Sequence, residues 1–281
     1  SGYTTALRNI GSIRNSGFEL QLDGRIIDRA VKWDLGVNFS LNRSKVLVLS
    51  EDKDIFGGEL DNTILKDQLN LMRVGEPMYV FYGYVEDGYD ENGHIVYKNM
   101  DDDPAITAAD KTIIGDPNPD FLVNLTTAVS YKGFTLSAFF QSSIGNDIYS
   151  LSMAAQAYDY GYNGNTLREV YYNHWTPENP TAKYPNLDQT SYKMSDRFVY
   201  DGSFVRLKNL ELAYDVPCAR SKFIKRARVY VSAQNLFTIT SYPFWDPDIN
   251  ANGGGSSMIQ GVDSYCYPSA RTYTIGCRLT F

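Results

Sequence analysis

Hydrophobic and polar positions alternate with a period of two along several stretches of this 281-residue chain. In the stretch 33–42, every odd position is apolar and every even position is polar or glycine. Successive side chains of a β-strand point to opposite faces, so this stretch predicts a strand with one apolar and one polar face. The same alternation recurs along the chain, and the predicted strands are 17–24, 32–42, 121–130, 134–141, 204–216, 227–235 and 271–281.

The predicted strands share two further features. The phase of the alternation slips near Lys208-Asn209-Leu210, which predicts a β-bulge there. The apolar faces carry no Lys, Arg, Asp or Glu, whereas the opposite faces are rich in Ser, Thr, Asn and Gln. A lipid-facing Arg or Lys at the bilayer midplane costs about 2–4 kcal/mol, so this distribution favours strands that cross a membrane.

The connections between the predicted strands fall into two length classes. Short turns are expected near 25–31, 131–133 and 217–226, and long loops over 43–120, 142–203 and 237–270. Loops of this length are uncommon in compact soluble domains. Transmembrane barrels combine short periplasmic turns with long extracellular loops. We therefore predict an all-β fold, an antiparallel transmembrane β-barrel, whose chain end lies on the periplasmic side.

A soluble β-sandwich that binds glycans is the alternative, because its sheets also keep charges off their inner faces. The two folds differ in what covers the apolar row that includes Trp33, Val37, Leu125, Val231 and Leu279. In a barrel this row contacts lipid, and in a sandwich it packs against a second layer of protein.

Composition and charge exclude several functions. The net charge of −7 argues against a nucleic-acid partner, because phosphate binding requires clustered basic residues. The two histidines, His94 and His174, lack metal-ligand spacing, and no catalytic constellation is visible, so we predict no metal, no cofactor and no enzymatic activity. The acidic stretch with Asp101, Asp103 and Asp110 is either a solvated loop or a cation site.

Two of the expected extracellular loops are rich in aromatic residues, which stack on sugar rings or on peptide side chains. We predict ligand contacts from six residues, with the alternatives that these aromatics form a girdle at the membrane edge or pack the loops together. The candidates are Tyr160, Tyr171, Tyr172 and Trp175 in one loop, and Trp245 and Asp246 in the other.

Short motifs add a family resemblance. The stretch 201–209 reads DGSFVRLKN and resembles a signature of the SusC-like (RagA-type) TonB-dependent transporters. Five other stretches resemble family motifs in the same order along the chain. They are NIGSIRNSGFE at 9–19, IGDPNPDF at 114–121, WTPENP at 175–180, VYVSAQNL at 229–236 and DPD at 246–248.

The resemblance implies that residues 1–281 form the C-terminal part of a 22-stranded barrel in the outer membrane of a Gram-negative, Bacteroidetes-like bacterium. The plug domain, the N-terminal strands and the TonB-contacting segment are then expected outside this chain. A SusD-like surface lipoprotein is the implied partner, and the cargo is a glycan or, second, an oligopeptide. Phe281 is similar to the C-terminal aromatic residue that the barrel-assembly machinery reads in this class.

Overall fold

The computed structural model describes residues 11–61, 65–158, 165–218, 223–249 and 258–281. Its largest element is a seven-stranded antiparallel sheet with the strand order β1-β2-β11-β12-β15-β16-β18. The strands are β1 (Gly11–Asp28), β2 (Val31–Leu49), β11 (Phe121–Tyr131), β12 (Phe134–Ile144), β15 (Phe204–Val216), β16 (Arg226–Thr240) and β18 (Thr272–Thr280).

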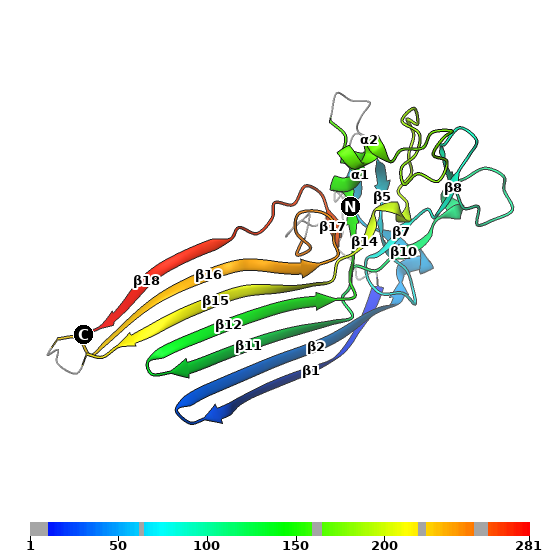
Figure 1. Cartoon of the computed structure of the whole chain (residues 1–281). Coiled ribbons are helices and arrows are strands. Elements are labelled where there is room, and N and C mark those ends of the chain that lie inside the picture. Colours follow the sequence, from blue (N-terminus) through cyan, green and yellow to red (C-terminus); the bar gives the residue numbers. More distant parts are fainter. Residues whose placement is uncertain (1–10, 62–64, 159–164, 219–222, 250–257) are drawn as a thin grey trace, which may run out of the picture.

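Figure 1 shows these strands side by side as one open sheet, with β1 and β18 at its edges. The short connections lie at the end where the chain terminates, and the long excursions gather at the opposite end. The antiparallel, strand-rich architecture confirms the predicted fold class, although seven strands do not close a barrel by themselves.

All seven predicted strands are present, but β1 and β2 are longer than expected. Their pairing continues from Asp28 opposite Lys32 to Gly11 opposite Leu49. The alternation of apolar and polar residues fades after position 42, because Asn42-Arg43-Ser44-Lys45 is polar on both faces. Backbone hydrogen bonding carries the hairpin beyond the point where the pattern ends.

The pairing register joins the apolar sides of the strands into one surface, here called the apolar face. Val37 lies opposite Leu22 and Leu125, and Val231 lies opposite Ile275. Within the described residues no second layer packs on this face (Figure 1), and Leu22, Val231 and Ile275 are 58%, 47% and 85% exposed. The alternative of a β-sandwich is therefore wrong.

The predicted bulge in β15 is confirmed. The register of β15 shifts between Leu207 and Asn209 against β16, and the register with β12 shifts opposite the same residues. Asn235, on the neighbouring strand, adopts a positive φ of 51° at this point. The bulge keeps apolar side chains on one face on either side of the irregularity.

The long excursions form a second packed region with its own secondary structure (Figure 1). It contains β3 (Ile55–Phe56), β4 (Glu59–Asp61), β5 (Lys66–Gln68), β6 (Asn70–Met72), β7 (Val80–Gly83), β8 (Glu86–Tyr89), β9 (Ile95–Tyr97), β10 (Thr112–Gly115), β13 (Asp147–Ser150), β14 (Val199–Asp201) and β17 (Val262–Asp263). Its helices are α1 (Leu151–Tyr158) and α2 (Arg168–Tyr172), with short 3-10 turns η1 (Ser50–Asp52), η2 (Ala108–Asp110) and η4 (Asp196–Phe198).

This region, the described residues of 50–120, 145–203 and 241–271, is called the loop domain below. All three excursions contribute to one hydrophobic core, with Leu69, Phe81, Tyr149, Phe198 and Val262 each at most 2% exposed. The long loops therefore do not extend separately into solvent. In the part of the chain that the structure describes, no helix is long and apolar enough to span a membrane.

Candidate functional site

The polar side chains of the sheet form a second continuous surface, here called the polar face. One register row crosses five strands of it, from Asn38 through Asn124, Gln141 and Arg206 to Thr238. The amides of Asn38, Asn124 and Gln141 hydrogen-bond to no other described residue. Neighbouring strands thus present unpaired amide donors and acceptors at the same height.

Arg206 ends this row of amides and is 2% exposed. Its guanidinium pairs with Asp246 and reaches Asp248 at 3.4 Å. It also donates to Thr238 Oγ1 at 2.9 Å and to Ser269 Oγ at 3.3 Å. A buried cation requires such partners because its desolvation is costly. Arg206 therefore ties the segments around 246 and 269 to the polar face.

Asp246 is the buried carboxylate in this attachment, at 6% exposure. Burial by itself raises its pKa, but the backbone NH groups of Ser269 and Asp248, each at 2.9 Å, and the Arg206 guanidinium outweigh burial. The pKa of Asp246 consequently lies below its usual range, and the carboxylate stays ionised at neutral pH.

Three adjoining hollows lie between the polar face and the loop domain. One of about 240 Å³ is lined by Asn124, Gln141 and Ser143 from the sheet. A second of about 270 Å³ shares Pro119 and Leu122 with the first. A third of about 350 Å³ shares Pro247 with the first and is lined by Trp245 and Arg206. Sheet and loop domain together therefore form a concave surface at the junction of the two regions.

The predicted aromatic residues around α2 differ in exposure. Tyr171 and Tyr172 are 60% and 65% exposed, and their rings meet edge to face with centroids 5.1 Å apart. Trp175 is only partly exposed, because its indole lies directly against Gly93. Its backbone NH donates to Tyr184 O at 2.8 Å. Tyr171 and Tyr172 are available to a ligand or partner, whereas Trp175 packs within the loop domain.

Trp245 presents the second exposed aromatic surface. It is 54% exposed and stacks on Phe244, with ring centroids 4.7 Å apart and an interplanar angle of 19°. Phe244 in turn packs against the core of the loop domain. The preceding Tyr242 is buried and donates to Asp263 Oδ2 at 2.6 Å. Stacking on Phe244 therefore positions the Trp245 ring, and the ion pair between Asp246 and Arg206 anchors the backbone directly after it.

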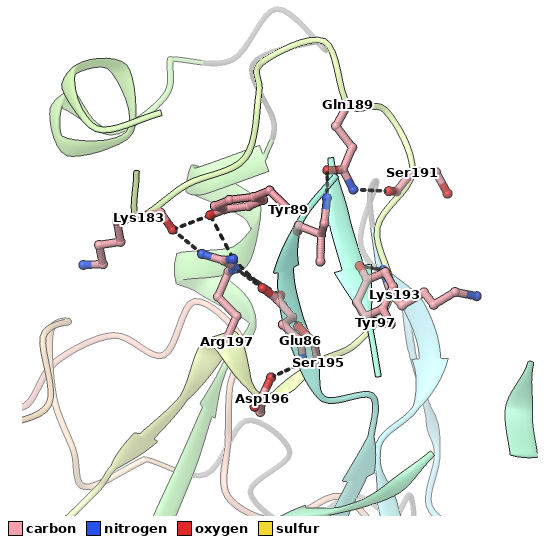
Figure 2. Close-up of polar contacts among 11 residues, drawn as sticks. Glu86, Tyr89, Tyr97, Lys183, Gln189, Ser191, Lys193, Ser195, Asp196 and Arg197 are labelled. Atoms are coloured by element: carbon pink, nitrogen blue, oxygen red, sulfur yellow. Dashed lines mark hydrogen bonds and ion pairs between the residues drawn. The ribbon is translucent and has the colours of Figure 1, made fainter. Parts of the chain in front are cut away.

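Figure 2 shows the polar contacts that join two excursions inside the loop domain. Arg197 in η4 donates through Nε to Glu86 Oε1 and Oε2 in β8, at 3.0 and 2.8 Å. Ser195 Oγ donates to Glu86 Oε1 at 2.6 Å, and Arg197 Nη2 donates to Tyr89 Oη at 3.1 Å. The Arg197 and Glu86 side chains are 17% and 10% exposed. This network links the loop that contains 86 to the loop that contains 197.

The acidic stretch at 101–110 uses its carboxylates within the loop. Asp110 is buried and accepts from the NH groups of Met100 and Thr107 at 2.7 Å each. Asp101 and Asp103 each accept an NH two residues further along. Within the described residues, no three His, Cys, Asp or Glu side chains gather as metal ligands would. Local turns account for these aspartates.

The chain is similar to several known proteins, although no family model matches it. It is 32% identical over its whole length to TonB-dependent receptor P3 of Formosa agariphila, and 28% identical over 98% of its length to TonB-dependent receptor SusC of Bacteroides thetaiotaomicron. The solved RagAB peptide transporter superposes on 97% of the chain with a TM-score of 0.79 and 26% identity.

This chain belongs to the SusC-like TonB-dependent transporters. It corresponds to their C-terminal part, and it spans 30% of receptor P3, 27% of SusC and 29% of the RagAB chain. The sheet is therefore part of an outer-membrane β-barrel. The matched proteins are named as receptors or as a peptide transporter.

Two of the predicted residues of this SusC-like chain lie outside the loop domain as described. Tyr160 lies outside the described residues. Phe281 follows β18 at the free edge of the sheet and is 71% exposed. Its role as an assembly signal stays a prediction.

Sequence analysis missed Arg206, Asn124 and Gln141 as site residues. In the sequence, Arg206 stands within the DGSFVRLKN motif, and a cation within an alternating strand is a signal for a buried partner. Asn124 and Gln141 were read only as polar positions of two strands. Their alignment in one row depends on register, which the alternation alone does not specify.

Proposed function

We propose that this chain is the closing wall and loop domain of a TonB-dependent importer that carries oligosaccharides across the outer membrane of a Bacteroidetes-like bacterium. The observation that supports it best is the combination of the uncharged amide row on the polar face with exposed aromatic rings in the loop domain. Amides read hydroxyl groups, and flat aromatic rings stack on sugar rings. The polar face is the lumenal side in this proposal, and the apolar face contacts lipid.

The predicted site residues take different roles in this proposal. Tyr171, Tyr172 and Trp245 are exposed and contact cargo or partner protein directly. Trp175 and Asp246 position other parts of the loop domain. Trp175 packs against Gly93, and Asp246 holds the segment that carries Trp245 through its pair with Arg206.

The proposal also assigns the partners. A SusD-like surface lipoprotein covers the loop domain from outside the cell. The plug domain, the N-terminal strands and the TonB-contacting segment come from the remainder of the transporter. In this arrangement the edge strands β1 and β18, whose side chains are largely exposed, pair with barrel strands outside this chain.

Oligopeptides are the second candidate cargo. The chain superposes on the RagAB peptide importer in its closed-closed state with a TM-score of 0.80 over 98% of the chain. The unpaired amides of the polar face also match the donors and acceptors of a peptide main chain.

Uptake by the full transporter distinguishes the two cargoes. A strain that lacks the transporter gene would be grown on neutral oligosaccharides or on oligopeptides as sole carbon source, with and without the restored gene. Growth on an oligosaccharide that depends on the gene supports the proposal. Growth that depends on the gene only on oligopeptides would establish the second candidate instead.

A further inference from the structure

Two of the three hollows form one cleft whose described lining is mostly uncharged. The cleft consists of the hollows of about 240 and 270 Å³, which share Pro119 and Leu122. The polar face supplies its floor, with Asn124 and Gln141. The loop domain supplies its roof, with Pro117, Pro119 and Pro247. Both described sides of the cleft therefore come from this chain.

Charge is almost absent from the cleft. Among the described side chains that line it, the only ionisable one is Asp248. Its carboxylate lies 3.4 Å from Arg206 Nη1 and 3.9 Å from Lys208 Nζ, so its charge is compensated locally. Such a surface offers no attraction to an anionic or cationic ligand and suits an uncharged one.

The floor of the cleft offers hydrogen bonds that the described chain does not use. Asn124 and Gln141 face each other across β11 and β12, and neither amide bonds to another described residue. Asn124 Oδ1 is shielded from solvent without a partner. A primary amide donates and accepts side by side, as a pair of neighbouring hydroxyl groups does. The accessible amide atoms of the two side chains can exchange water for the hydroxyl groups of a ligand.

The cleft has the size of a short segment of a linear oligomer. It extends over β1, β2, β11, β12 and β15, four interstrand spacings or on the order of 20 Å. Each hollow is smaller than the ~300 Å³ at the lower limit of drug-sized pockets, so it fits one ring rather than a whole oligomer. The third hollow adjoins through Pro247 and places Trp245 at the end of the same row.

We propose that this cleft is a binding site for consecutive residues of an uncharged oligosaccharide. Asn124 and Gln141 bond the hydroxyl groups, and the proline rings of the roof cover the apolar faces of the sugar rings. Arg206 is a positioning residue, because its pairs with Asp246 and Asp248 hold the roof segment around Pro247. The inference rests on the proposed import of oligosaccharides and adds the residues that hold the cargo.

The test uses the complete transporter with its lipoprotein partner, purified in detergent. Binding of a panel of neutral gluco-, manno-, xylo- and galacto-hexasaccharides is measured by calorimetry for wild type and for Asn124→Ala/Gln141→Ala. We expect the Kd of the bound hexasaccharide to rise about 10-fold in the double variant. Asn209→Ala is the matched control, because Asn209 lies on the polar face but outside the cleft, and its Kd should stay within about twofold of wild type.

The Asn124→Leu and Gln141→Met variants remove the amide hydrogen bonds at similar side-chain volume. They guard against misfolding of the double variant, and they should also weaken binding. An unchanged Kd, or an equal loss in Asn209→Ala, overturns the cleft. If the double variant melts at a lower temperature but its Kd for the hexasaccharide is unchanged, the two amides contact the plug domain, and the proposed binding site is also wrong. Uncharged hexapeptides are measured in the same way. If the double variant binds the hexapeptides more weakly but binds the hexasaccharides as well as wild type does, the proposed ligand class is wrong. A wild-type transporter that binds none of the hexasaccharides overturns the proposed cargo as well, a result distinct from the others.

Discussion

The sheet and the loop domain place similar apolar residues in opposite surroundings. On the apolar face of the sheet, Leu22 and Ile275 are 58% and 85% exposed, whereas Leu69 and Phe81 in the loop domain are completely buried. In water, apolar side chains are stabilised by burial, at roughly 25 cal/mol per Å². The loop domain follows this rule by building a core, and the sheet depends on lipid for the same purpose.

The two regions also treat charge differently. The loop domain buries ion pairs such as Arg197–Glu86, and Arg206 at the junction is almost inaccessible. The apolar face carries no charged residue in the predicted strand segments. The loop domain therefore has the buried core of a protein surrounded by water, and the sheet has the uncharged, exposed apolar surface of a protein surrounded by lipid. Substitutions in the two regions should break this contrast to different degrees, most strongly at the buried ion pair of the loop domain.

The buried ion pair of the loop domain should matter most. Arg197→Met leaves the Glu86 carboxylate, 10% exposed, without its counter-charge. We expect a loss of about 3–5 kcal/mol in the stability of the loop domain, because an uncompensated buried charge is costly. Hydrogen exchange of the loop domain in the full transporter measures it. The control is Lys183→Met, which breaks an exposed pair with Glu169 and should cost about 1 kcal/mol or less.

A charge on the apolar face should have the next largest effect. Val231→Arg places a cation on the surface assigned to lipid, and we expect a loss of about 2–4 kcal/mol. Urea titration of the transporter folded into lipid vesicles measures this change. Ser232→Arg, one residue away on the polar face, should cost far less. Equal losses in both variants would contradict the assignment of the two faces.

Gly93 supports Trp175 in the loop domain, and its replacement should have a moderate effect. Gly93 has a φ of +80°, and a Cβ there would lie 2.2 Å from Trp175 Cδ2. Gly93→Ala should therefore cost about 1–3 kcal/mol, from backbone strain and displacement of the indole. Thermal unfolding measures this loss. Gly88→Ala separates the two causes, since Gly88 has a φ of +97° but nothing within 4 Å. Equal losses would rule out the contact.

The smallest expected effect is that of acid on the segment that carries Trp245. The pKa of Asp246 is lowered in the folded protein, so its contribution is complete above the unfolded value near 3.9 and is lost as pH falls further. We expect a loss below about 1 kcal/mol between pH 6 and pH 3, seen as increased quenching of Trp245 fluorescence in a variant that keeps only this tryptophan. Asp246→Asn should show raised quenching at both pH values. A pH-dependent change of the same size in Asp246→Asn would exclude Asp246 as its cause.

Sequence patterns predicted the sheet well because each strand repeats its signal locally. All seven strands, their two faces and the bulge at Lys208 are visible as alternation and as a slip in phase. The two neighbours of any side chain in a strand point the other way, so a few residues suffice to show which positions share a face. The motif at 201–209 pointed to the family for a similar reason.

The loop domain could not be predicted in this way. Its described strands are all two to four residues long, too short to show a period, and its core combines residues from three excursions far apart in the sequence. The exposure of the candidate aromatics was equally hidden. Tyr172 is exposed and Trp175, three residues later, packs against Gly93, a difference that arises from contacts across 82 positions of sequence.

By itself, the sequence determined which side chains share the apolar face and which share the polar face, because strand geometry converts alternation directly into two surfaces. Only the tertiary structure decided which polar side chains meet. Asn124, Gln141 and Arg206 come into one row because the register of β11, β12 and β15 aligns them, and Asp246 reaches Arg206 because the chain folds back over the sheet. Such pairings depend on hydrogen-bond register and on the return path of a loop, and neither is encoded in a local period.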